Sequence, residues 1–84
     1  MPVLSVPVTP PLIVIEILSP DDRLSDVRGK LREYLAWGVP HIWLADPEQR
    51  TFSVFDHSGL RDVVRLEIPE TDQVLMPADV FDEV

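Results

Sequence analysis

The stretch LIVIEILSP, Leu12 to Pro20, decides the fold because a strongly apolar segment ends there in a sharp stop. Side chains alternate between the two faces of a strand, so one face would carry Leu12, Val14, Glu16 and Leu18 and the other Ile13, Ile15 and Ile17. Apolar residues on both faces are typical of a central strand in a covered sheet. A buried carboxylate costs several kcal/mol unless something pairs with it. We therefore expect Glu16 to lie near solvent or to have a cation close by.

The length, composition and net charge limit the classes of protein that this chain can belong to. Its 84 residues suffice for one small domain, and without cysteine it has neither disulfides nor thiolate metal sites. No apolar run reaches the roughly 20 residues of a membrane span. The net charge of −8 argues against non-specific nucleic-acid binding through a basic surface. The composition suits a reducing cytosol, and we expect a cytoplasmic protein that does not bind membranes.

The residues after the first strand predict a βαβ unit. SPDDR stops the strand, and Asp21 or Asp22 is a suitable N-cap for a helix whose apolar positions follow a helical period. Gly38 ends this helix, with Pro40 just beyond it. HIWLADP then predicts a second strand, closed by a turn that begins at Asp46. Strands joined by a helix in this way should be parallel neighbours.

The remaining segments predict a hairpin and a short docked end. TFSVFD (51–56) and RDVVRLEI (61–68) flank HSGL, which is a hairpin signal. VLMPADVFDEV closes the chain with apolar residues that suit a short packed segment. Residues 1–11 contain several prolines and predict an irregular lead-in, with the domain over 12–84.

The βαβ geometry gives Glu16 a candidate partner. Glu16 lies about 10 Å below the top of its strand, at roughly 3.3 Å per residue. Lys30 lies about 12 Å down the following helix, at roughly 1.5 Å per residue. Lys30 borders the apolar face of the helix, so its stem can lie on the sheet while its ammonium reaches the carboxylate. We therefore predict that Glu16 faces the helix and that Lys30 is its nearest base.

Two interpretations of this pair stay open. The structural one is a plain Glu16–Lys30 salt bridge, or Lys30 paired with Asp26 one turn back. The functional one is a carboxylate that binds magnesium, a cation that prefers oxygen ligands, with the lysine near the attacked phosphate. Metal and lysine together can activate water and stabilise phosphoryl charge. His41 and His57 are not spaced as a metal pair, and we expect both at the surface.

Several motifs follow one another over residues 10–84 at a specific spacing: Glu16, Leu18-Ser19-Pro20, Lys30, Tyr34, Gly38-Val39-Pro40, Trp43 and Asp46-Pro47. This pattern resembles the Uma-two family of putative restriction endonucleases. The family's hallmark is an apolar strand with a glutamate before Leu-Ser-Pro, a helix with a lysine and a tyrosine, Gly-Val-Pro, an aromatic-rich strand and Asp-Pro.

The resemblance implies a PD-(D/E)XK nuclease fold, which is an α/β fold with a restriction-endonuclease-like mixed sheet, here built on the βαβ unit plus the hairpin. It implies DNA as substrate, Glu16 as a magnesium ligand and Lys30 as the catalytic lysine, moved from the strand to the helix. The family also has an N-terminal half that supplies further acids, and it commonly has Pro-Asp where this chain has Pro11-Leu12. We therefore expect a domain truncated at the N-terminus, with an incomplete site.

Two functions follow from these expectations. The first is a magnesium-dependent DNA endonuclease that is weak or inactive alone. The second is a non-catalytic remnant of the same fold that works by association. In either case the loss of earlier strands would leave Leu12 to Leu18 as an edge with unpaired backbone groups. We expect the chain to form a homodimer, bind a complementary fragment or aggregate through this strand.

Overall fold

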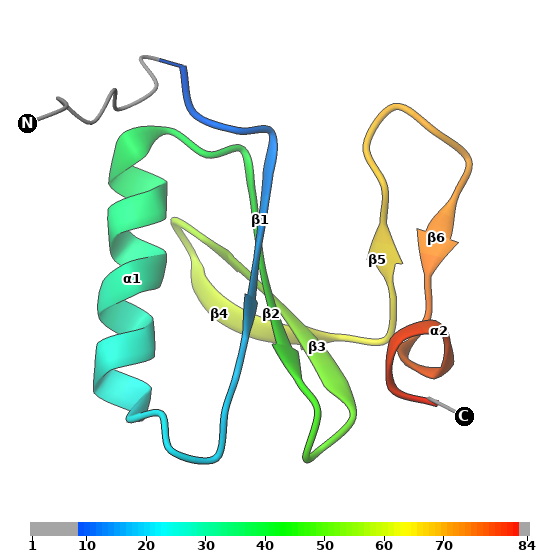
Figure 1. Ribbon diagram of the computed structural model, residues 1–84. Helices are drawn as coiled ribbons and strands as arrows, with labels where there is room; N and C mark the ends of the chain where they lie inside the picture. The colour runs from blue at the N-terminus through cyan, green and yellow to red at the C-terminus, as the bar shows by residue number, and fades with distance from the viewer. Residues whose placement is uncertain (1–8, 83–84) are drawn as a thin grey trace, which may run out of the picture.

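The computed structural model describes residues 9–82, which form one four-stranded sheet, one two-stranded sheet and two helices (Figure 1). The first eight residues of the predicted lead-in lie outside the described residues, and residues 9–12 contain neither helix nor strand. No helix in the described part of the chain is long and apolar enough to span a membrane. In chain order the elements are β1 (Ile13–Ile17), α1 (Leu24–Trp37), β2 (His41–Asp46), β3 (Thr51–Asp56), β4 (Gly59–Val63), β5 (Leu66–Glu67), β6 (Val74–Leu75) and α2 (Pro77–Phe81).

The predicted βαβ unit is present. β1 pairs with β2 in parallel, with Glu16 opposite Leu44, and α1 connects the two strands. β2, β3 and β4 continue the sheet in antiparallel fashion, so the strand order is β1-β2-β3-β4. β1 therefore has one partner among the described strands and lies at the edge of the sheet. The apolar pattern of β1 is typical of a central strand, but the expectation that this strand forms an edge is confirmed within the described residues, because no described strand pairs with its outer side.

The start of α1 differs from the prediction, whereas its end agrees with it. The N-cap is Arg23, which forms no side-chain cap hydrogen bond. The carboxylate of Asp22 instead accepts a hydrogen bond from the backbone N–H of Ser19, 2.8 Å away. The Asp22 side chain thus closes the turn between β1 and α1. At the other end, Gly38 adopts φ = 99° and its N–H bonds to the last turn, which is a left-handed cap that glycine adopts at low cost.

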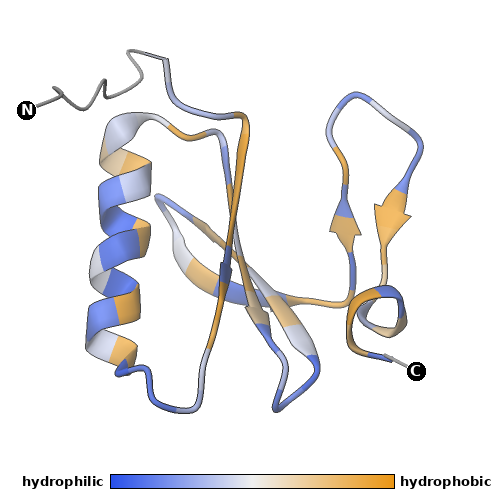
Figure 2. Ribbon diagram, in the orientation of Figure 1, coloured by the Kyte–Doolittle hydropathy of each residue, from blue (hydrophilic) through white to orange (hydrophobic). Residues whose placement is uncertain are grey.

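One layer of the core lies between α1 and the sheet. In Figure 2 the apolar residues of α1 face the strands, as its helical period predicts. The buried residues of this layer come from α1, from its C-terminal connection and from β2: Val27, Leu31, Val39, Ile42 and Leu44. Val14 of β1 and Leu18, which directly follows this strand, pack against them. Glu16 lies between these two on the same face of the strand, which places its carboxylate beneath the helix.

The other face of the sheet is covered in part by β5, β6 and α2 (Figure 1). Its buried residues are Trp43, Ala45, Phe52 and Leu66. The segment 61–68 is not one strand, as its sequence predicted. The chain bends at Val64, and Leu66 pairs with Leu75 of β6 instead of continuing β4. The predicted docked end is confirmed, because Val80 and Phe81 pack against this layer.

Candidate active site

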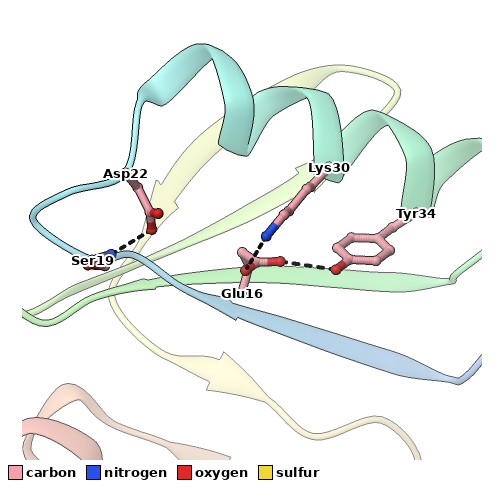
Figure 3. Close-up of polar contacts among 5 residues, drawn as sticks. All are labelled: Glu16, Ser19, Asp22, Lys30 and Tyr34. Atoms are coloured by element: carbon pink, nitrogen blue, oxygen red, sulfur yellow. Dashed lines mark hydrogen bonds and ion pairs between the residues drawn. The ribbon is translucent and has the colours of Figure 1, made fainter.

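Glu16 occupies the middle of β1 and points towards α1 (Figure 3). Its side chain is 20% exposed, since apolar neighbours on the strand and the helix above cover most of it. A carboxylate in such a place needs compensation for lost hydration. Two side chains from successive turns of α1, Lys30 and Tyr34, supply it.

Tyr34 makes the shorter contact. Its hydroxyl donates a hydrogen bond to Oε1 of Glu16 at 3.1 Å. Burial, followed by this hydrogen bond and the negative charges of Glu16 and Glu33, raises the pKa of Tyr34 above its ordinary value of 10.0. The phenol therefore stays protonated near neutral pH and holds the carboxylate in a fixed orientation.

Lys30 makes the looser contact. Its Nζ lies 3.9 Å from Oε2 of Glu16, and its side chain is 60% exposed. That separation is too long for a hydrogen bond, and an exposed ion pair of this kind adds little stability. The ammonium points towards the carboxylate (Figure 3), while most of the lysine side chain remains exposed to solvent.

The proximity that the spacing predicted is confirmed, because Glu16 faces the helix and Lys30 is the base paired with it. The alternative pairing of Lys30 with Asp26 is not found among the ion pairs of residues 9–82. The contact of Tyr34 with Glu16 was not predicted. Its signal was present, since Tyr34 follows Lys30 by four residues and so lies on the same side of the helix.

The carboxyl ends of β1 and β2 border a separate cavity of about 450 Å³ lined by Leu18, Ser19, Pro20, Asp46, Pro47 and Glu48. Asp46 has a turn role here, as predicted, because its Oδ1 accepts hydrogen bonds from the N–H groups of Glu48 and Gln49. In α/β folds this end of the strands often binds ligands. Glu16 does not line this cavity, so the two features are distinct.

The donors near Glu16 do not make a complete magnesium site. Magnesium takes octahedral oxygen coordination, commonly from one or two carboxylates together with water and substrate phosphate. Within residues 9–82 no group of three or more histidine, aspartate or glutamate side chains is placed to hold a metal. Glu16 alone faces Lys30 and Tyr34, and both of its oxygens already have partners. The arrangement offers one oriented carboxylate, one neutral hydroxyl and one exposed cation.

Comparison with known proteins identifies a family and similar solved structures. The model of the Uma2 family, described as putative restriction endonuclease, matches residues 5–84. The crystal structure of a putative nuclease belonging to DUF820 from Anabaena variabilis is similar at a TM-score of 0.65 and 28% identity. The similarity covers 86% of this chain and 44% of that protein, so the chain spans less than half of its neighbour's length. A search of curated proteins gives no match. The predicted α/β class, a mixed sheet built on a βαβ unit plus a hairpin, is confirmed, and the fold is nuclease-like.

Proposed function

Because this chain belongs to the Uma2 family of putative restriction endonucleases, we propose that its site acts on the phosphodiester bonds of DNA. The observation that carries the proposal is the position of Glu16 in β1, with Tyr34 at 3.1 Å and Lys30 at 3.9 Å. A family match alone would leave the site unassigned. The contacts favour Glu16 among the acids of residues 9–82, because it is the acid that pairs with Lys30 of α1 there.

The three side chains have separate roles in this proposal. Glu16 is a ligand for a divalent metal, magnesium by the chemistry of its oxygen donors. Lys30 lies near the attacked phosphate and stabilises the charge that develops there. Tyr34 is a positioning residue, since it acts on DNA only through the orientation of Glu16. We place all three in residues 12–84, which we take as part of a restriction-endonuclease-like domain, in a protein that meets its DNA in the cytoplasm.

The single carboxylate at this site limits its expected affinity for magnesium and its expected rate of DNA cleavage. Among the described residues a single chain gives magnesium one protein ligand at this site, Glu16, which Lys30 also attracts, so we expect weak metal binding and only slow cleavage by the isolated chain. The net charge of −8 further disfavours the approach of DNA at low salt.

The second candidate is a non-catalytic association module of the same fold. It is favoured by the absence of a three-ligand cluster within residues 9–82 and by the edge position of β1. As part of this candidate we propose that the chain associates through the strand Leu12 to Leu18. The two candidates differ in whether Glu16 matters to DNA chemistry.

The deciding experiment is nicking of supercoiled plasmid DNA by the purified 84-residue chain in magnesium chloride. We expect slow nicking that Glu16→Gln and Lys30→Ala abolish. The matched controls are Asp72→Asn, an exposed acid in the loop between β5 and β6, and Arg32→Ala, an exposed base on α1. Nicking that is equal in all five proteins would identify a contaminant and remove the support for the active-site assignment. No nicking by the parent chain would favour the association module.

A further inference from the structure

The outer side of β1 carries a regular row of unpaired backbone groups. The carbonyl of Leu12 accepts from the N–H of His41, and the N–H of Leu18 donates to the carbonyl of Ala45. In a strand, residues of the same parity direct their backbone groups to the same side, so the even-numbered residues bond to β2. The N–H and C=O groups of Ile13, Ile15 and Ile17 therefore point away from β2, and no strand among residues 9–82 pairs with them.

The side chains of the same residues form an exposed apolar row. Ile15 is 46% exposed and Ile17 62% exposed, on the face opposite α1. The single charge of β1, Glu16, lies on the other face and is paired by Lys30. Ile17 also borders an apolar hollow of about 280 Å³ lined by Ala45, Pro47, Val80 and Phe81. Strand edges are commonly protected by charge or proline, and this edge has neither in its middle.

We propose that a second copy of this chain pairs with the outer side of β1 in antiparallel fashion, about a twofold axis at Ile15. The pattern is self-complementary in this register. Ile15 lies opposite Ile15 of the second copy, and Ile13 lies opposite Ile17. The twofold axis repeats the second contact, which makes three pairs: Ile15 with Ile15, Ile13 with Ile17 and Ile17 with Ile13. All three are hydrogen-bonded pairs, so each outward N–H and C=O group of these isoleucines gains a partner.

Side-chain contacts favour the same register. The isoleucines of both copies lie on one face, where Ile13 of the second copy comes to the hollow beside Ile17. On the other face Glu16 lies opposite Val14 of the second copy, so like charges are not directly opposed. Strands are about 4.8 Å apart, which leaves the two α1 helices roughly 10–14 Å apart on their common face. Packed helices need about 8–10 Å, so they do not collide.

The pairing also changes the candidate active site, and this part of the inference rests on the proposed function of Glu16. Glu16 of each copy becomes a diagonal neighbour of the other across the axis, at roughly 7–8 Å. Long side chains can bridge such a distance, so both carboxylates can approach one divalent cation. The second copy would supply the second acid that a single chain lacks. The metal should in turn tighten the dimer, because it binds the paired form better than the single chain.

Sedimentation equilibrium of the 84-residue chain tests the pairing with two matched sets of variants. Ile15→Pro removes an N–H that points outwards and should raise the dimer dissociation constant by at least about tenfold while the chain stays folded by circular dichroism. Val14→Pro removes an N–H that bonds to β2 and should destabilise the fold instead. Ile15→Lys places two like charges at the axis and should also separate the copies. Val64→Lys alters another exposed apolar residue, which is 73% exposed and distant in sequence from β1, and should leave the dimer unchanged.

The register has its own test, because the chain contains no cysteine. A single Ile15→Cys variant should be joined to its copy by a short bis-maleimide, whereas Ser58→Cys in the β3–β4 turn should not. A monomer at about 100 μM, open-ended aggregation, or a dimer that Ile15→Lys and Ile15→Pro leave intact would overturn the pairing.

Measuring the dimer dissociation constant with and without magnesium distinguishes a failure of this inference from a failure of the proposed function. In magnesium chloride the dimer dissociation constant should fall by at least about tenfold, and Glu16→Gln should remove that dependence while keeping the dimer. A dimer indifferent to magnesium would overturn the shared two-carboxylate site and leave the pairing in place. Plasmid nicking that Glu16→Gln leaves unchanged, in a dimer that associates as described, would count against the proposed function alone.

Discussion

The hydroxyl of Tyr34 donates a hydrogen bond to the carboxylate of Glu16 across 3.1 Å, although eighteen positions separate the two residues in the chain. This contact joins α1 to the edge strand of the sheet. It makes Tyr34, more than the exposed Lys30, the residue that compensates for the burial of the acid. Three of the predictions below follow from this difference.

Replacing Tyr34 with phenylalanine should lower the free energy of unfolding by about 1 kcal/mol, since a hydrogen bond to a charged group is lost from a carboxylate that solvent still reaches in part. Urea denaturation measures the change. The double variant with Glu16→Gln should show less than the sum of the two single effects. Strict additivity would mean that the two side chains are not coupled.

Lys30→Ala should change the free energy of unfolding by less, about 0.2–1 kcal/mol, because the lysine is 60% exposed and 3.9 Å from the acid. The same denaturation experiment checks it, with Arg32→Ala as the control on α1. A loss above that of Tyr34→Phe would show that the ion pair, and not the hydrogen bond, holds the carboxylate.

Tyr34 should also give the chain a pH dependence at the alkaline end. Burial, together with Glu16, raises the pKa of Tyr34 above 10.0 in the folded chain. The unfolded chain loses the phenolic proton first as pH rises. The stability that Tyr34 contributes is therefore fully present below about pH 10 and is lost as pH rises through the folded pKa. Above pH 10, stability should fall more steeply in the parent chain than in Tyr34→Phe. Equal slopes would contradict the buried hydrogen bond.

The two glycines of α1 and its cap should respond in opposite ways to alanine. Gly29 lies within the helix, and a Cβ added there meets no atom within 4 Å, so Gly29→Ala should stabilise by about 0.5–1 kcal/mol. Gly38 has φ = 99°, where an L side chain is strained, so Gly38→Ala should destabilise by about 1–2 kcal/mol. Thermal unfolding of the two variants tests where α1 ends and does not depend on the proposed function.

Leu31→Ala should be the most damaging single truncation in α1, at about 2–5 kcal/mol, because Leu31 is fully buried beneath the helix. Leu24→Ala, at a position on the same helix that is 54% exposed, is the matched control and should cost far less. Similar losses of unfolding free energy in both variants would mean that α1 packs on the sheet through a different face.

The parts of the fold that the sequence predicted are those fixed by local chemistry. The alternation in LIVIEIL, the helical period after it and Gly38 each act over a few residues, so pattern was sufficient. The bend at Val64 was not predictable in this way, because Leu66 leaves the line of β4 only to pair with Leu75, nine residues later. The N-cap was predicted wrongly although the chemistry is local, since either of two neighbouring aspartates could cap the helix and Asp22 instead accepts a hydrogen bond from the N–H of Ser19.

In the candidate site, too, the contacts set by local spacing were predicted and those set by non-local packing were not. The height of Lys30 opposite Glu16 follows from the rise per residue of a strand and a helix, so spacing predicted their proximity. The spacing of Tyr34, four residues after Lys30, places it on the same side of the helix, but the hydrogen bond itself depends on where its hydroxyl ends, and spacing does not give this. The exposure of Ile15 and Ile17 was expected only if β1 lacked an outer partner, which depends on non-local pairing.

The strand order β1-β2-β3-β4 repeats the order of the chain, and this has a consequence for folding. β2, β3 and β4 are joined by short turns, so their contacts are local and can form early. β1 joins them only after α1 has crossed over, which closes a longer loop. The last strand to be added should also be the first to open, with β1 amides exchanging before those of β2 and β3. Because the Glu16 site lies between β1 and α1, it would be assembled at the final step of folding and be the first part of the molecule to come apart.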